Sequence, residues 1–277
     1  MAMAQELFEN TRTYANGQYN SLYNQTLAEV KEDFFFAVPI QTAVRFRRWD
    51  VLDKFESEEQ LTEIIAQRKL YFTRAMWSYA ALLRDIDQNG VTKGAALEGL
   101  RNFWAAVVAA PRDLVYGTNA AADLFRIANL VLIARLFEAL PQADVNTMVA
   151  EVKTGMFANA TLKADAVVFN GTDRAILIIA ALTNAIDLQD GLTYNEPDAW
   201  YYSVRESLGA ALYRQGRFAE AEAVFRADLD HNRGNGRSIY GLIESLHGQG
   251  KSVPDWLNAA FEQAWRHATV QLSLTDM

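Results

Sequence analysis

Two short acidic runs are the residues best suited to metal chemistry. Residues 85–89 read Asp-x-Asp-x-Asn and, with Gly90 after them, copy the opening of an EF-hand calcium loop. The twelfth position of that loop holds Ala96, where a bidentate glutamate is needed, and the second run, residues 228–232, has no glycine at its sixth position. Aspartate and asparagine also form turns at helix ends. We therefore expect turns at both runs, and no metal.

The remaining candidates for metal or catalytic chemistry are equally weak. His231, His247 and His267 lie too far apart in the sequence to form a compact zinc motif. The sequence contains no nucleophile elbow, no phosphate-binding loop, no His-Glu-x-x-His motif and no cysteine. Glu220 and Glu222 alternate on a helix and point in different directions. We predict no catalytic residue and no cofactor, and a helical hydrolase with two separated carboxylates is the least favoured alternative.

One cluster of arginines offers anion chemistry. Arg45, Arg47 and Arg48 follow one another closely enough to bind an anion together. Acidic residues follow within a few positions, so an intramolecular network of ion pairs is at least as strongly favoured: these are Asp50, Asp53 and Glu56.

The composition indicates a soluble globular protein. Of the 277 residues, 51% are hydrophobic and 22% are charged, with a net charge of −8. This acidic balance argues against nucleic-acid binding, which needs a concentrated positive face. The apolar stretches 127–136 and 175–182 are too short to span a membrane, so we expect core helices and no membrane insertion. A leader can be missing if the chain is a fragment, which leaves both cytoplasm and periplasm open.

The pattern that must position these residues is helical nearly throughout. Apolar residues recur at spacings of three and four, which predicts about a dozen helices of roughly 12 to 20 residues. The one strand-like segment is residues 166–171. All five prolines are expected at helix ends: Pro39, Pro111, Pro141, Pro197 and Pro254. The sequence therefore predicts an all-α protein of stacked antiparallel helix hairpins.

Residues 199–235 resemble a tetratricopeptide repeat. Seven positions match the first helix, the turn and the second helix of that repeat: Leu208, Gly209, Leu212, Gly216, Phe218, Ala221 and Phe225. The chain departs from the pattern at Arg205, Asp228 and Arg233. A second copy, about 34 residues later, uses Leu242, Gly250 and Phe261.

The resemblance weakens toward the N-terminus. Residues 1–196 are predicted to be a degenerate helical-repeat region with an insertion near 157–172, continuous with the clearer repeats and capping helix of 197–277. In the degenerate region Arg47 stands where a turn glycine is expected. The last helix carries Trp256, Leu257 and Phe261 on one face and is expected to cap the stack. The chain is also similar to the C-terminal half of a group of uncharacterised bacterial tetratricopeptide-repeat proteins.

The resemblance implies a right-handed superhelix with a concave groove lined by the first helix of each repeat. On that basis we predict a non-catalytic module that binds a peptide segment or partner helix. The alternatives are a self-assembling scaffold and one half of a larger repeat protein. The lining residues would be Glu206, Tyr213, Arg214, Arg237, Tyr240, Glu244 and His247, of which the tyrosines and arginines are the best candidate anchors.

Overall fold

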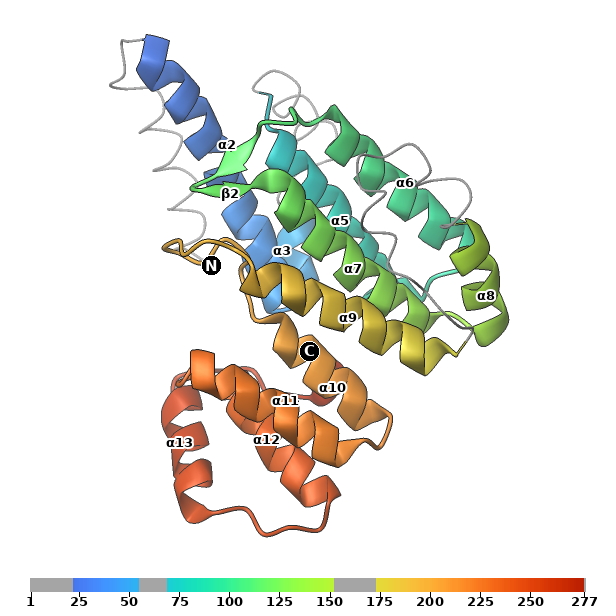
Figure 1. The fold of residues 1–277 in the computed structure, drawn as a ribbon, viewed down its shortest axis with the longest axis vertical. Coiled ribbons are helices and arrows are strands. Elements are labelled where there is room, and N and C mark those ends of the chain that lie inside the picture. Colours follow the sequence, from blue (N-terminus) through green and yellow to red (C-terminus); the bar gives the residue numbers. More distant parts are fainter. Residues whose placement is uncertain (1–21, 55–68, 152–172, 277) are drawn as a thin grey trace.

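The computed structural model describes residues 22–54, 69–151 and 173–276, and Figure 1 shows its fold. Within these ranges the chain forms eleven α-helices and one two-stranded hairpin, which confirms the prediction of an all-α protein. The predicted insertion at 157–172, the strand-like segment at 166–171 and Glu56 lie outside the described residues. The helices of the N-terminal part are α2 (Leu22–Arg45), α3 (Trp49–Lys54), α5 (Tyr71–Asn89), α6 (Lys93–Ala109), α7 (Ala121–Ala139), α8 (Gln142–Glu151) and α9 (Arg174–Asp190).

These helices pack in a row in which each contacts the next. α2 packs on α5, α5 on α6 and α7, and α7 on α9 (Figure 1). The hairpin of β1 (Val115–Tyr116) and β2 (Asn119–Ala120) joins α6 to α7 and contacts α2. Asp33 of α2 accepts hydrogen bonds from the first backbone amides of α5, those of Phe72 at 2.7 Å and Thr73 at 2.8 Å. The side chain thus satisfies donors that a helix start leaves without intrahelical partners.

α7 forms the centre of this row because its sequence is apolar on nearly every side. The consecutive residues 130–134 are all buried, as are Phe125 and Phe137. A helix that is hydrophobic all round has to be covered on all sides, and α5 and α9 supply part of that cover. Within the described ranges, every helix is too short or too polar to cross a membrane.

The C-terminal part is a smaller group of helices below the row in Figure 1. It consists of α10 (Val204–Arg214), α11 (Phe218–His231), α12 (Gly236–Gly248) and α13 (Asp255–Trp265), and α10 packs on α9. The ring of Phe225 on α11 lies against Gly209 of α10 and Gly241 of α12. A Cβ atom at Gly209 would lie 2.6 Å from that ring. Glycine at both positions is therefore what allows α11 to approach its two neighbours closely.

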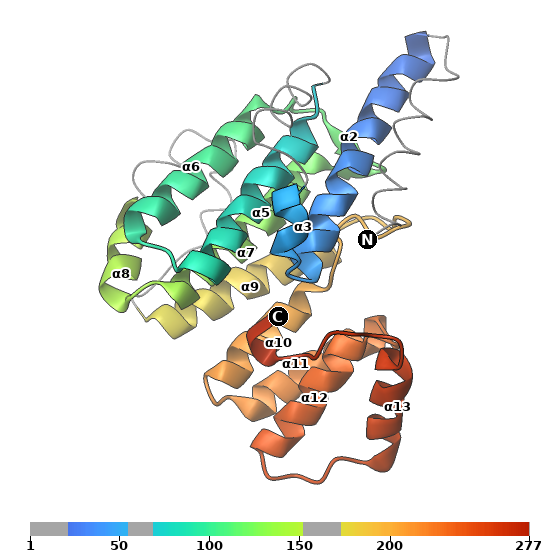
Figure 2. The ribbon, with the colours of Figure 1, turned by 180° about the vertical axis from the view of Figure 1, so that it is seen from behind.

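After α13 the chain turns back toward α10 and ends in a short 3₁₀ helix, η3 (Leu274–Asp276), seen from behind in Figure 2. Leu274 is buried and η3 packs on α10. The expected apolar face of α13 forms in part: Leu257 is buried and Phe261 stacks on Trp265. Trp256, by contrast, is 64% exposed.

One expectation about the prolines is wrong. Pro39 lies inside α2 and not at a helix end. A proline inside a helix removes one backbone hydrogen bond. Ala37, Ile40 and Ala43 are buried on either side of it, and this packing holds the turn in a helical conformation. The other four prolines lie outside the helices.

Candidate functional site

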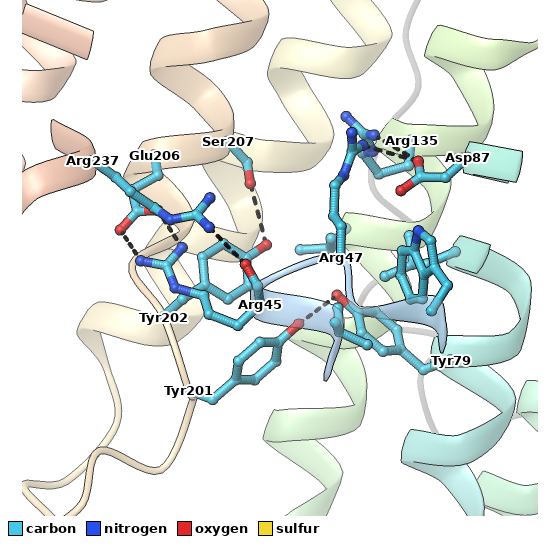
Figure 3. A pocket seen from close by; sticks show the side chains of 14 residues that line it. Arg45, Arg47, Tyr79, Asp87, Arg135, Tyr201, Tyr202, Glu206, Ser207 and Arg237 are labelled. Carbon is cyan, nitrogen blue, oxygen red and sulfur yellow. Dashed lines mark hydrogen bonds and ion pairs between the residues drawn. The ribbon is translucent and has the colours of Figure 1, made fainter. Parts of the chain in front are cut away.

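A cavity of about 60 Å³ lies where the row of helices meets the C-terminal group. The end of α2 and the turn after it, α5, α7, the segment before α10, α10 itself and α12 all contribute to its wall (Figure 3). We call it the arginine–tyrosine cavity after the side chains that line it: Arg45, Arg47, Arg135, Arg237, Tyr79, Tyr201, Tyr202, Asp87, Glu206 and Ser207.

A buried ion pair forms one side of the cavity. Arg45, at the end of α2, donates from Nη2 to Oε1 of Glu206 on α10 at 2.7 Å, and its Nη1 donates to Oε2. The Glu206 side chain is only 1% exposed. Asn235, which caps α12, donates to the same Oε1 at 2.7 Å. A charge removed from water in this way needs a partner and hydrogen bonds, and Glu206 has both.

Arg237 ties α12 to the same point. Its Nη2 donates to the backbone carbonyl of Arg45 at 2.7 Å, and its guanidinium carbon lies 5.9 Å from the centre of the Phe46 ring. Arg237 is 5% exposed. Residues separated by most of the chain are therefore held together by one side chain.

A second ion-pair group lies on the other side of the cavity in the view of Figure 3. Asp87 of α5 accepts from Arg47 at 2.9 Å and from Arg135 of α7 at 3.2 Å, and Arg135 also pairs with Glu138. Arg47 has a φ of 49°, in the left-handed region, at the position where a turn glycine was expected. This conformation belongs to the turn that follows α2.

Three tyrosine hydroxyls complete the wall. The hydroxyls of Tyr79 and Tyr201 lie 3.3 Å apart, and that of Tyr202 lies 3.2 Å from Oγ of Ser207. Burial raises the pKa of all three phenols above their usual range, so they are neutral hydrogen-bonding groups at neutral pH. The guanidinium carbon of Arg45 lies 5.4 Å from the centre of the Tyr202 ring.

A larger cleft of about 590 Å³ adjoins the cavity. We call it the junction cleft: it lies between the α9–α10 connection, residues 191–203, and the α11–α12 turn, residues 232–235. Arg45, Tyr202 and Glu206 line both the cleft and the cavity, and so separate them.

The connection that borders the cleft is anchored at both ends. The amide of Asn119 exchanges two hydrogen bonds with the backbone of Thr193, at 2.7 and 2.9 Å. At the other end, Gln189 donates to the carbonyl of Tyr202 and accepts from the amide of Val204. The cleft is thus held open by side-chain contacts within the chain.

The seven residues predicted to line one groove are divided among several places. Glu206 and Arg237 meet at the arginine–tyrosine cavity. Arg214 donates to the carbonyl of Leu274 and pairs with Glu138, so the returning C-terminal segment and α7 occupy it. The four others contact neighbours on the C-terminal helices: Tyr213 packs on Phe218, Tyr240 on Phe261, and Glu244 lies 3.6 Å from His247.

The predicted arginine network also differs from its expected partners. Arg48 pairs with Asp50, as the spacing suggested, whereas Asp53 pairs with Arg84. Arg45 and Arg47 reach carboxylates far away in the sequence. Tyr79, Asp87, Arg135, Tyr201 and Tyr202 were not predicted as site residues, because no local spacing connects them.

Both acidic runs serve internal contacts. Asp87 belongs to the cavity, and Asp228 is buried and accepts hydrogen bonds from Asn232, Asn235 and Ser238. Over the described part of the chain, no three His, Asp or Glu side chains are grouped as metal ligands. Searches for similar proteins found no match: no family model, no curated protein and no solved structure resembles the chain. Its function is inferred from geometry alone.

Proposed function

We propose that the chain is a non-catalytic protein-binding module that holds an extended segment of a partner protein in the junction cleft. In this proposal α10–α13 are two tetratricopeptide-like hairpins at the end of a right-handed superhelix of hairpins. The close approach of three helices around Phe225 supports such hairpins, since the repeat uses small residues at the same positions.

The shape and lining of the junction cleft carry the proposal. Its volume of about 590 Å³ falls in the size range of ligand sites. Its wall offers the amides of Asn195 and Asn232 and the guanidinium of Arg233, groups that hydrogen-bond to peptide backbone. Tyr194 stands at the cleft with 76% of its surface exposed, and tyrosine supplies a large contact area at low entropic cost.

The carboxylates of the cleft are better suited to structure than to catalysis. Asp190 accepts from Arg205 at 2.8 Å, and this hydrogen bond lowers the pKa of Asp190. Glu206 is bound by Arg45 and Asn235. A general acid working near neutral pH needs a raised pKa and a free proton to donate, so these two groups support a binding role.

A self-assembling scaffold is the second candidate function. Trp256 is 64% exposed on the last long helix, and an exposed tryptophan is a frequent centre of protein contacts. On this alternative, the partner is another copy of the chain and the contact lies on α13.

Site-specific photocrosslinking tests the choice. A photoreactive residue placed at Tyr194, in the cleft, is compared with one at Val108, which is 73% exposed on α6. In lysate of the source organism we expect adducts with a partner protein from position 194 and none from 108. Arg233→Glu should abolish these adducts, whereas Arg217→Glu, in the α10–α11 turn, should not. Equal adducts from both positions, or adducts only between copies, would contradict binding in the cleft.

A further inference from the structure

Beyond this proposed function, we propose that the arginine–tyrosine cavity binds a small oxyanion, the phosphate or carboxylate group of a ligand. The site is separate from the junction cleft, because the Arg45–Glu206 pair lies between the two. The inference therefore does not depend on what the cleft binds.

The first argument is the excess of hydrogen-bond donors. Four guanidinium groups, three phenols and one serine hydroxyl line the cavity, against two carboxylates. Each guanidinium carries five N–H donors and no acceptor. A ligand that complements such a wall must be rich in acceptors, and guanidinium groups match the oxygens of phosphate and carboxylate.

The second argument is charge in a site with little water. The side chains of Arg45 and Arg135 are 20% and 16% exposed, and Arg237 is almost completely buried. The four arginines outnumber the three carboxylates that pair with them, Asp87, Glu138 and Glu206. An excess of positive charge in a poorly hydrated site is costly, and a bound anion removes that excess.

The third argument is size and direction. A cavity of about 60 Å³ admits one small oxyanion and excludes a nucleotide or a peptide segment. In Figure 3 the Arg45–Arg237 group and the Arg47–Arg135 group lie on opposite sides, with the Ser207 and Tyr202 hydroxyls near the first. An oxyanion between them can accept from donors on two sides. The site would thus link the turn after α2 to α10 and α12.

Phosphate titration of the full chain tests this inference. Inorganic phosphate is added at constant ionic strength, with chloride as the matched salt, and binding is followed by calorimetry and by the thermal midpoint. We expect saturable binding and a rise in the midpoint that chloride does not produce. Arg47→Gln should weaken binding by about tenfold or more, the effect of losing a charge-assisted contact. Arg217→Gln, at an exposed arginine outside the cavity, should leave it unchanged.

Two further variants separate lost binding from lost folding. Arg47→Lys keeps the charge but not the two-pronged donor geometry, so it should bind more weakly than wild type and more tightly than Arg47→Gln. Tyr202→Phe keeps the ring beside Arg45 and removes one hydroxyl. We expect a several-fold loss of affinity with an unchanged circular dichroism spectrum.

The source of the oxyanion is distinguished by two more ligands. Acetate tests a carboxylate, and a short phosphoserine peptide tests a phosphate carried on a protein. Binding of phosphate or acetate without the peptide indicates a free anion, and binding of the peptide as well indicates a group on a larger molecule. The inference is overturned if phosphate and acetate shift the midpoint no more than chloride does, or if Arg47→Gln binds phosphate as tightly as wild type.

Discussion

Glu222 of α11 makes three polar contacts that fix the C-terminal helices to one another. It accepts from Lys251 at 2.9 Å and Gln249 at 2.8 Å, beyond the end of α12, and pairs with Arg226 on its own helix. Hydrogen bonds from Lys251 and Gln249 are the main causes that lower the pKa of Glu222 from 4.5 to about 2. The folded chain therefore binds a proton at this site less readily than the unfolded chain does.

This shift predicts a pH-dependent part of the stability. The stabilising contribution of Glu222 is complete above its unfolded pKa of 4.5 and is lost as the pH falls toward 2. Glu222→Gln should therefore reduce the free energy of unfolding more at pH 6 than at pH 3. Urea denaturation at the two pH values measures the difference between variant and wild type. An equal difference at both pH values would show that the carboxylate charge contributes nothing.

At the same scale, sequence reasoning found only part of the candidate site. Arg45, Arg47, Glu206 and Arg237 were singled out because they lie in an arginine cluster or at helix positions that face one way. Their actual partners could not be predicted, since local spacing says nothing about residues 161 positions apart, such as Arg45 and Glu206. The role of Tyr201 depends on Tyr79 in the same way.

The elements of the fold were easier to predict than their contacts. Apolar periodicity identified helices, and Gly209, Gly216 and Phe225 were placed by their resemblance to a repeat. Gly216 lies in the α10–α11 turn with a φ of 73°, a conformation that favours glycine. The position of Pro39 inside α2 was missed, because burial on both sides of the proline outweighs its local preference.

The packing of α11 between α10 and α12 predicts a marked sensitivity to a single methyl group. Gly209→Ala and Gly241→Ala each place a Cβ against the ring of Phe225, which has neighbours on both sides. We expect each to destabilise the fold by about 1–3 kcal/mol, the usual cost of overpacking. Urea denaturation provides the measurement.

Gly94→Ala is the matched control for these two variants. Gly94 also lies in a helix, α6, but the nearest atom to an added Cβ there is the Thr92 hydroxyl, at 3.9 Å. Alanine in this place should leave stability unchanged or raise it by up to about 1 kcal/mol, because glycine is a poor helix former. A similar loss at all three glycines would contradict the importance of the close approach.

In the whole molecule, the Arg45–Glu206 pair connects the row of helices to the C-terminal group. Glu206→Ala leaves the guanidinium of Arg45 without this carboxylate in a largely buried place. We expect a loss of about 3 kcal/mol in the free energy of unfolding, as for other buried pairs that lose one partner. Glu220→Ala, which removes an exposed pair with Arg217, should cost at most about 1 kcal/mol. Similar losses for the two variants would show that the buried pair does not hold the parts together.

The contact between Arg237 and the Arg45 carbonyl also has a consequence for how a newly made chain acquires its site. Translation delivers α2, α5 and α7 first, then α10, and only afterwards the α12 residue that closes the cavity. Domains begin to fold while synthesis continues, so the row of helices can assemble on the ribosome around α7. Neither the cavity nor the cleft exists until residue 237 has emerged. A nascent chain stalled before that point is therefore folded in part and unable to bind.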